Sequence, residues 1–145
     1  MLFRSRSGTP ALNDPQFPSA HYKLVGEQLW QRAGVGPADV DVAQVYENFT
    51  GMVVISMSEM GFASPKGIEE FTSNGNIELG GKLPVNTSGG NLAEAYIHGF
   101  ELVNEAVRQV RGESTQQVAK VEHSLVVAGP GYVPGSAVLF ADKQG

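Results

Sequence analysis

The first part of the chain with a regular apolar pattern begins near His21. From there, apolar residues recur at the spacing of one helical face, at Leu24, Val25, Leu29, Trp30 and Ala33. This spacing predicts an amphipathic helix over residues 21–33, which Gly34 ends. Residues 1–20 hold prolines and glycines among polar residues. We expect an irregular lead-in there, followed by one domain over residues 21–145.

The next segment changes from a helical to an extended pattern. Residues 40–46 (VDVAQVY) are a short, β-branched run, which predicts a strand. Residues 48–51 are expected to open a second helix that continues to Met60. Residues 63–85 contain several glycines, two prolines and few large apolar groups. They predict a long loop, and loops of this length in compact domains are usually functional.

The helical pattern returns after a glycine-rich turn at residues 86–90 (NTSGG). A long helix is predicted from there to about Arg111, and Gly112 ends it. The apolar stripe of this helix consists of Leu92, Tyr96, Gly99, Val103, Ala106 and Val110.

Two strands are predicted in the tail, at residues 124–128 and 137–141. The Gly- and Pro-rich segment 129–135 joins them and is expected to form a hairpin. The order helix, strand, helix, long loop, helix, strand, strand is typical of an α/β layered domain. We therefore expect a mixed sheet that ends in an antiparallel pair.

Composition narrows the function classes. The chain has 145 residues, a net charge of −5 and a pI near 5.1, and its lysines and arginines form no basic run, which argues against a nucleic-acid binder. It contains no cysteine and therefore no thiol nucleophile. Its three histidines lack metal-ligand spacing, and we expect no metal. Since it lacks a membrane-length apolar run and a signal-peptide core, we expect no membrane contact and a cytoplasmic protein.

The turn at residues 86–90 is the first candidate for chemistry. Its glycines allow a ligand to approach the backbone, and free amides at a helix N-terminus favour negative charge. Such a turn would cradle a phosphate or stabilise a developing enolate. On the pattern alone the structural interpretation is favoured, in which Thr87 or Ser88 caps the helix and the glycines form the corner.

Polar groups also gather after the first predicted strand, and strand ends are common site positions in α/β folds. The plainer interpretation is that Tyr46 covers the core and Glu47 lies in solvent. Tyr96 and His98 are two positions apart on the predicted helix, about 200° around it, and would not face one site together. The segment 129–135 either lines a pocket or only makes a turn.

Taken together, these segments resemble the C-terminal half of the thiolases. Thiolases carry Asn-Glu-Ala-Phe after a strand, then Asn-x-x-Gly-Gly followed by Gly-His-Pro on a buried helix, and last a glycine-rich hairpin with a cysteine. Residues 46–49, 86–90 and 129–131 are similar to this series, in the same order. The resemblance runs from about residue 21 to the end. It implies an α/β fold, the thiolase-like half-domain, which is a βαβαβαββ layered mixed sheet with helices.

The departures from the thiolase pattern change the chemistry that the resemblance implies. Tyr46 stands where the first motif has Asn, Tyr96 stands where the catalytic His belongs, and the hairpin has no cysteine. Claisen condensation needs a thiolate, and His and Asn to hold an oxyanion hole. Thiolase activity is therefore not expected. We also expect the N-terminal thiolase half, with its nucleophilic cysteine, to be absent from this chain.

Residues 86–90 (NTSGG) and 95–99 (AYIHG) are similar to the sterol-carrier-protein-X-like, or lipid-transfer-protein, branch of the superfamily. Members from steroid-degrading actinobacteria are aldolases that cleave a 17-hydroxy steroid side-chain acyl-CoA into a 17-ketosteroid and propionyl-CoA. The resemblance implies a carbon–carbon lyase with an acyl-CoA substrate and no cofactor beyond the coenzyme A of that substrate. It also implies a partner with an OB-fold and a zinc ribbon. Because the half-domain alone would expose the face that packs on its pseudo-twin, we expect a separate N-terminal thiolase half, a homodimer, or both.

The same branch uses a pair of tyrosines, which the resemblance places at Tyr46 and Tyr96. One is expected to take the hydroxyl proton, and the other to orient the substrate or reprotonate the enolate; the sequence does not divide these roles. Amides near Gly89 and Gly90 are expected to stabilise the oxyanion. The substrate-binding set is expected to be Asn48, Ser88, Gly89, Gly90 and Gly131.

Two non-enzymatic interpretations stay open. In one, the chain is a non-catalytic thiolase-like scaffold that docks an OB-fold partner. In the other, it is an acyl-CoA or lipid carrier that binds without turnover. Formation of product from an acyl-CoA substrate separates the enzyme from both.

Overall fold

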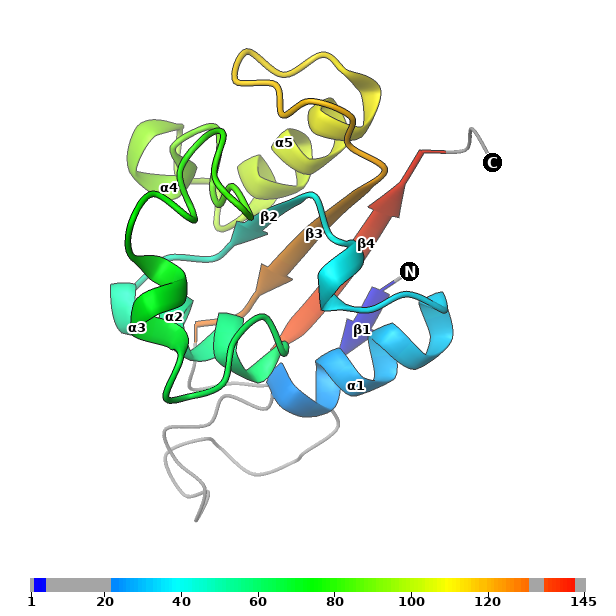
Figure 1. Ribbon diagram of the computed structural model, residues 1–145. Helices are drawn as coiled ribbons and strands as arrows, with labels where there is room; N and C mark the ends of the chain where they lie inside the picture. Colours follow the sequence, from blue (N-terminus) through cyan, green and yellow to red (C-terminus); the bar gives the residue numbers. More distant parts are fainter. Residues whose placement is uncertain (1, 5–21, 131–134, 143–145) are drawn as a thin grey trace.

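The computed structural model describes residues 2–4, 22–130 and 135–142 (Figure 1). The predicted helix over 21–33, the strand over 40–46, the helix ending near residue 60 and the two strands of the tail are confirmed, with small shifts at their ends. The elements in chain order are β1 (Leu2–Arg4), α1 (Tyr22–Ala33), the 3-10 helix η2 (Pro37–Asp39), β2 (Val42–Val45), α2 (Thr50–Glu59), α3 (Ile68–Thr72), α4 (Gly90–Ala93), α5 (Phe100–Arg111), β3 (His123–Ala128) and β4 (Ser136–Ala141).

The strands form one mixed sheet in the order β1-β4-β3-β2. β2 and β3 run parallel, with Ala43 opposite Leu125, whereas β4 pairs antiparallel with both β3 and β1. Beyond β2, an isolated parallel bridge joins Ala43 to Val85. With that bridge as a rudimentary strand, the chain follows the expected βαβαβαββ order, and the prediction of an α/β fold with a mixed sheet is confirmed.

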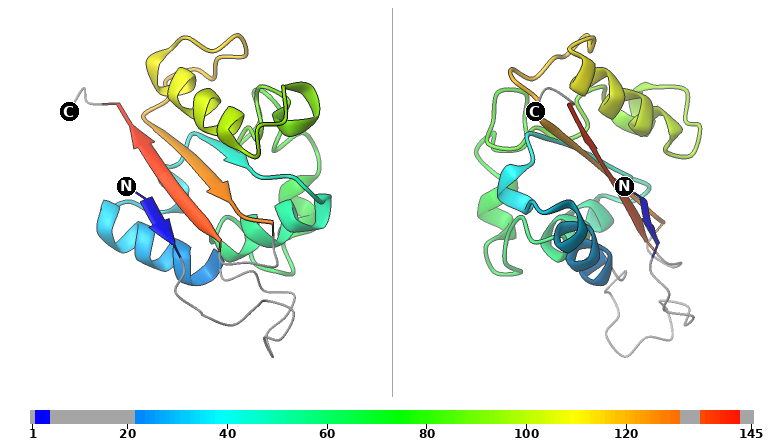
Figure 2. Two further views of the ribbon diagram at one scale, coloured as in Figure 1. Left: turned by 180° about the vertical axis from the view of Figure 1, so that it is seen from behind. Right: turned by 90° about the vertical axis from the view of Figure 1, so that its right-hand side faces the viewer.

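Helices cover both faces of this sheet, as the two views in Figure 2 show. On one face, α1 packs against β4 and against α2. On the other face, α5 packs against β2 and β3. Leu125 and Val127 of β3 join the core beneath α1, and Val126 between them joins Leu102 and Ala106 of α5. The strand serves both cores because successive side chains point to opposite faces.

The predicted continuous helix to Arg111 was wrong, because α4 and α5 are separated by residues 94–99. Tyr96, His98 and Gly99 in this break have φ values of 39°, 56° and 88°, and such left-handed values interrupt a right-handed helix. Leu92 therefore does not share a stripe with α5 and is 90% exposed. α5 does end at Gly112, as predicted, with a φ of 70°.

Two segments expected to be irregular contain short elements. The predicted loop over 63–85 includes α3, because Ile68 and Phe71 pack against the main core. The expected lead-in over 1–20 includes β1, where Leu2 lies opposite Val138. A strand this short pairs through its backbone and leaves no readable side-chain pattern. Residues 5–21 lie outside the described residues.

Three segments far apart in the sequence meet where β2 and β3 end. The amide of Tyr46 donates to the carbonyl of Val127 at 2.9 Å, which joins the segment after β2 to the end of β3. The side chain of Asn86 exchanges two hydrogen bonds with the backbone of Val45, at 2.7 and 2.9 Å. Residues 46–50, 86–90 and 129–130 are thereby gathered at one edge, since the carboxyl ends of parallel strands lie on the same side of a sheet.

Candidate active site

The hydroxyl groups of Tyr46 and Tyr96 lie side by side at this edge, with their oxygens 3.0 Å apart. Tyr46 directly follows β2, and Tyr96 lies in the turn between α4 and α5, 50 positions further along the chain. The separation is that of a hydrogen bond between two hydroxyl groups. The two tyrosines named as catalytic from the sequence therefore form one structural unit.

The ring of Tyr46 is held by contacts with the core and with Gly99. It packs against the cluster of Leu102 and Val126, and it also lies close to Gly99, where an added Cβ would come within 3.0 Å of Tyr46 Cδ2. The φ of 88° at Gly99 is a second reason for glycine at this position. The ring is half-buried, whereas its hydroxyl contact with Tyr96 is exposed.

The surroundings of Tyr46 favour its protonated form. The hydrogen bond with Tyr96 is the largest cause, followed by burial and by nearby negative charge, including that of Glu101 and Glu47; together they raise the pKa of Tyr46 to about 12. A free tyrosine has a pKa of about 10. Tyr46 is therefore protonated at neutral pH.

Tyr96 is not the core residue that the helical stripe predicted, because its side chain is 45% exposed. Its ring meets the ring of His98 edge to face, with centroids 5.2 Å apart. The expectation that these two side chains would not face one site was wrong. It assumed helical geometry, whereas the left-handed backbone at both residues makes a tight turn. His98 is thus a neighbour of the tyrosine pair.

A buried carboxylate holds the turn that carries Tyr96. Glu101, in the first turn of α5, is only 1% exposed. Its two oxygens accept the backbone N–H groups of Ile97 and Gly99, each at 3.1 Å. Glu101 was not among the residues predicted from the sequence, although an acidic residue two positions after Gly99, in the first turn of a helix, was an available signal, since negative charge is stabilised there.

A second carboxylate, that of Glu47, holds the glycine-rich turn. Glu47 accepts hydrogen bonds from the backbone N–H and the side-chain amide of Asn91. Its carboxylate lies against Gly90, where a Cβ would overlap it. The interpretation of Glu47 as a side chain in solvent was wrong, because the amides at the start of α4 attract it inward.

The amides on either side of Gly90 are engaged within the fold. The N–H of Gly89 donates to the carbonyl of Asn86 at 2.8 Å, and the N–H of Asn91 donates to Glu47. The expectation that amides near Gly89 and Gly90 stabilise an oxyanion does not hold for these two. Glycine is nevertheless needed at both positions, since their φ values are 88° and 61°.

Thr87 and Ser88 do not cap the following helix, as one interpretation expected. Gly89 is the N-cap of α4, with no side-chain hydrogen bond. Thr87 Oγ1 instead donates to the buried Glu105 at 2.5 Å, which ties the turn to α5. Ser88 Oγ is buried and has no hydrogen-bond partner in the part of the chain that the structure describes.

Asn48 connects the site to the segment after β3. Its side-chain amide donates to the carbonyl of Pro130 at 3.1 Å, and the buried hydroxyl of Tyr22 donates to the carbonyl of Gly129 at 2.6 Å. Burial raises the pKa of Tyr22 above its usual range. The observed contact of Asn48 thus orients the backbone beside the site, while Gly131 lies outside the described residues.

Several large apolar residues are exposed in the segments that carry the tyrosine pair. Exposed large hydrophobic residues in the segments that carry the pair are Phe49, Leu92, Tyr96, Ile97 and Phe100. Exposed large apolar residues that form a contiguous patch mark interaction or binding surfaces. The site is therefore an open surface in this chain.

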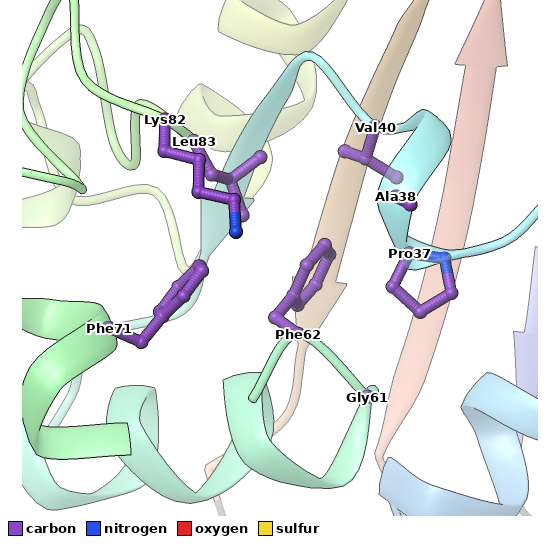
Figure 3. Close-up of a pocket in the computed structure, with 8 residues that line it drawn as sticks. All are labelled: Pro37, Ala38, Val40, Gly61, Phe62, Phe71, Lys82 and Leu83. Carbon is purple, nitrogen blue, oxygen red and sulfur yellow. The ribbon is translucent and has the colours of Figure 1, made fainter. Parts of the chain in front are cut away.

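A cavity of about 200 Å³ lies elsewhere, between η2, the end of α2 and α3 (Figure 3). Neither Tyr46 nor Tyr96 borders it. Its lining residues are Pro37, Ala38, Val40, Gly61, Phe62, Phe71, Lys82 and Leu83. Polar and apolar surface contribute about equally to its walls, and the amino group of Lys82 stands 5.9 Å from the ring centre of Phe71. The cavity thus lacks the paired proton-transfer groups of the tyrosine site.

The described ranges contain no group of three or more His, Asp or Glu side chains placed to hold a metal ion. Within the same ranges, no helix has the length and apolar character needed to cross a membrane. Among the described residues, the candidate groups for proton transfer are Tyr46 and Tyr96, and the carboxylates of Glu47 and Glu101 hold the backbone segments around them.

This combination of sheet, turn and hairpin matches a known family. The family model for the thiolase C-terminal domain-like fold covers residues 11–140. The chain belongs to this family. As a thiolase-like domain it also shares its fold with the yeast peroxisomal 3-ketoacyl-CoA thiolase, described as a five-layered structure built from two core domains of identical topology. That match has a TM-score of 0.53 and 15% identity, and it covers 89% of this chain and 31% of the yeast chain.

More similar members of the family are named as steroid lyases. The thiolase-like domain is 50% identical over 117 residues to a 17-hydroxy-3-oxo-4-pregnene-20-carboxyl-CoA lyase of Mycobacterium tuberculosis, and 44% identical over 120 residues to a steroid side-chain-cleaving aldolase of Thermomonospora curvata. These matches cover 81% and 83% of this chain, but 30% and 31% of the relatives. A solved Ltp2-ChsH2(DUF35) aldolase matches with a TM-score of 0.77 and 44% identity, over 85% of this chain and 32% of that one. The chain therefore spans about 30% of the length of the relatives it matches.

Proposed function

We propose that this chain supplies the catalytic tyrosines of an aldolase that cleaves the side chain of a 17-hydroxy steroid acyl-CoA, giving a 17-ketosteroid and propionyl-CoA. The observation that carries the proposal is the 3.0 Å contact between the hydroxyls of Tyr46 and Tyr96. Relatives that are 44–50% identical and are named as a lyase and an aldolase support it. The absence of cysteine from the chain agrees with a reaction that needs no thiolate.

The proposed reaction moves one proton and needs no covalent nucleophile. A base takes the proton of the 17-hydroxyl, the carbon–oxygen bond becomes a carbonyl, and the bond to the α-carbon of the acyl group breaks. The electron pair of that bond forms the thioester enolate, and an acid then protonates the α-carbon to release propionyl-CoA. The proton taken equals the proton returned, so no oxidant or reductant is involved. Two phenols within hydrogen-bond distance are suited to this transfer.

The two tyrosines receive different roles in this proposal. Tyr46 is assigned as the acid, because its raised pKa of about 12 keeps its proton in place at neutral pH. Tyr96 is assigned to the hydroxyl proton of the substrate. The 3.0 Å contact between the two hydroxyls, in which either oxygen can donate, gives the proton a direct path between the two tyrosines.

The apolar surface around the pair is proposed to be covered by the steroid and by a second thiolase-like half. This agrees with the share of the relatives' length that the chain spans, and with the two core domains of the yeast thiolase. A protein of the DUF35 type, with an OB-fold and a zinc ribbon, is proposed as the partner, because a solved relative is named for such a complex. The homodimer, the cytoplasmic location and the absence of a cofactor other than the substrate's coenzyme A stay predictions from the sequence.

The test uses the longest native form of the protein, produced together with its DUF35-type partner. It is incubated with a 17-hydroxy steroid side-chain CoA thioester, and 17-ketosteroid and propionyl-CoA are followed by mass spectrometry. Tyr46→Phe and Tyr96→Phe are each expected to lower kcat by about 10²–10⁴-fold, the usual contribution of a general acid or base. Thermal unfolding of each variant checks that the fold is kept.

Near-normal turnover in both tyrosine variants would contradict the proposed mechanism. If the wild-type protein forms no product but binds acyl-CoA saturably, the chain is a carrier. If it binds only the partner, it is a scaffold.

A further inference from the structure

The turn between α4 and α5 is held in a backbone conformation that it would not adopt unaided. Tyr96 and His98 have φ values of 39° and 56°, and each non-glycine residue in this region is disfavoured because its Cβ approaches the next carbonyl. Residues in such conformations persist only when the surrounding structure determines them. Something near this turn must therefore stabilise the arrangement that presents Tyr96.

The carboxylate of Glu101 is the group that does so. One oxygen accepts the N–H of Ile97, the residue after Tyr96, and the other accepts the N–H of Gly99, both at 3.1 Å. Hydrogen bonds to an ionised acceptor are stronger than those between neutral groups, and the side chain is 1% exposed, so water competes little. Its place in the first turn of the twelve-residue helix α5 adds the favourable field of the helix N-terminus.

The same carboxylate also fixes the other tyrosine. Glu101 accepts the N–H of Gly99, and the ring of Tyr46 packs against this same residue. A Cβ added to Gly99 would lie only 3.0 Å from Tyr46 Cδ2. One side chain therefore secures the backbone next to Tyr96 and the backbone beneath Tyr46. It touches neither hydroxyl in the hydrogen bonds observed, so its action is indirect.

We infer that Glu101 is a positioning residue for the proposed aldol cleavage, which sets the distance between the hydroxyls of Tyr46 and Tyr96 through the amides of Ile97 and Gly99. This inference rests on the proposed function. Its structural part, the anchoring of the turn, stands on the contacts alone. Misplacement of a catalytic group by about 1 Å is enough to lower a rate by about 10²-fold.

Glu101 acts on proton transfer as well as on geometry. The groups that face Tyr46 and raise its pKa are Tyr96 first, then Glu101 and Glu47, and His98 lies beyond Tyr96. Removing the charge of Glu101 is therefore expected to lower the pKa of Tyr46. Because the proposal needs Tyr46 protonated, the alkaline fall of kcat would then move to lower pH.

The test compares Glu101→Gln with Glu105→Gln in the longest native protein with its partner. Glu105 is a matched control, because it is equally buried, lies one turn along the same helix, and accepts hydrogen bonds from Thr87, Gln109 and Ser114 rather than from the amides of residues 94–99 that carry Tyr96. Gln at 101 offers one acceptor oxygen in place of two, and its NH₂ group meets a backbone donor.

Three results are expected for Glu101→Gln and not for Glu105→Gln. First, kcat falls by about 10–100-fold with little change in KM. Second, the alkaline limb of the kcat profile moves to lower pH. Third, the amides of Ile97 and Gly99, followed by NMR, exchange with deuterium about tenfold faster, as expected for the loss of one hydrogen bond. If Glu101→Gln does not fold, Glu101→Asp, which keeps the charge but shortens the reach, is measured against wild type with the same expectations for kcat and exchange.

Tyr46→Phe and Tyr96→Phe are assayed in the same series, so that the two proposals fail in different ways. If the tyrosine variants lose turnover while Glu101→Gln matches Glu105→Gln, the positioning role is overturned and the aldolase stands. If the tyrosine variants keep turnover, the proposed function fails, and amide exchange alone then decides the anchoring. Unchanged exchange at Ile97 and Gly99 in Glu101→Gln overturns it.

Discussion

The contact between Tyr46 and Tyr96 places two phenols of different character together. Tyr46 is half-buried on the α5 side of the sheet, and its pKa is raised to about 12, with the hydrogen bond to Tyr96 as the largest cause. Tyr96 is the more exposed member, on a turn of unusual backbone conformation. The environment of Tyr46 keeps it protonated at neutral pH, which is the starting state that the proposed acid role requires.

Tyr96→Phe is expected to lower the pKa of Tyr46 from about 12 toward the ordinary tyrosine value of about 10, because it removes the largest cause of the shift. Titration of the phenolate absorbance in the ultraviolet measures this, with Tyr46→Phe identifying the signal of Tyr46. A pKa near 12 that persists in Tyr96→Phe would show that burial and charge, rather than the hydroxyl contact, control the shift.

The same shift predicts how stability depends on pH. The folded pKa of Tyr46 lies above the unfolded one, so the unfolded chain releases this proton first as pH rises. Its contribution to stability is intact below about pH 10 and is lost as pH rises through about 12. Tyr22 shifts in the same direction, so the contribution of Tyr46 is the difference between wild type and Tyr46→Phe in urea denaturation. Identical loss in both proteins over this range would contradict the raised pKa.

At the scale of elements, the break between α4 and α5 creates the site. A continuous helix would carry Tyr96 on a regular helical face, whereas the turn at residues 94–99 brings its hydroxyl to that of Tyr46. Gly99 permits the turn in two ways, through its φ of 88° and through the close approach of Tyr46. The break is therefore a defined turn rather than a frayed helix end.

Gly99→Ala is expected to reduce both stability and turnover, and Gly112→Ala to reduce stability alone. Each places a Cβ at a left-handed φ, of 88° and 70°, for about 1–2 kcal/mol of strain. Only at Gly99 does the Cβ also meet a side chain, that of Tyr46; at Gly112 nothing lies within 4 Å. Urea denaturation gives the free energy of unfolding, and the product assay gives kcat. If both variants are destabilised equally and kcat is unchanged in both, the conformation of the turn at Gly99 does not contribute to catalysis.

For the whole molecule, the exposure of large apolar residues on α4 and α5 has a consequence for association. Leu92 and Phe100 are 90% and 63% exposed, on the face of the sheet that carries α4 and α5. Surfaces of this kind drive association when nothing covers them. The 145-residue chain on its own is therefore expected to self-associate with increasing concentration.

Replacing Leu92 and Phe100 together by Ser is expected to reduce this self-association, measured by sedimentation velocity. Leu79→Ser is the control, since Leu79 is also an exposed apolar residue, at 53%, but lies in the loop between α3 and α4. The expectation fails if Leu79→Ser lowers association as much as the double variant does.

Local pattern determined much of this protein. The spacing of apolar residues predicted α1, β2 and the two strands of the tail, and Gly112 marked the end of α5, because these features depend on residues that are neighbours in sequence. The order of the motifs identified the thiolase resemblance and named both tyrosines. The missing cysteine argued against thiolase chemistry before any geometry was known.

Tertiary structure alone decided how the two tyrosines meet. Helical periodicity extended through residues 94–99 because nothing in apolar spacing reports a carboxylate that binds backbone amides. Two further features depend on contacts that the chain makes only when folded. They are the hydrogen bonds that hold Glu47 against Asn91 and the ring contact between Tyr96 and His98. Sequence pattern reports which face of an element is buried, whereas the 3.0 Å contact between residues 50 positions apart depends on hydrogen bonds that override local preference.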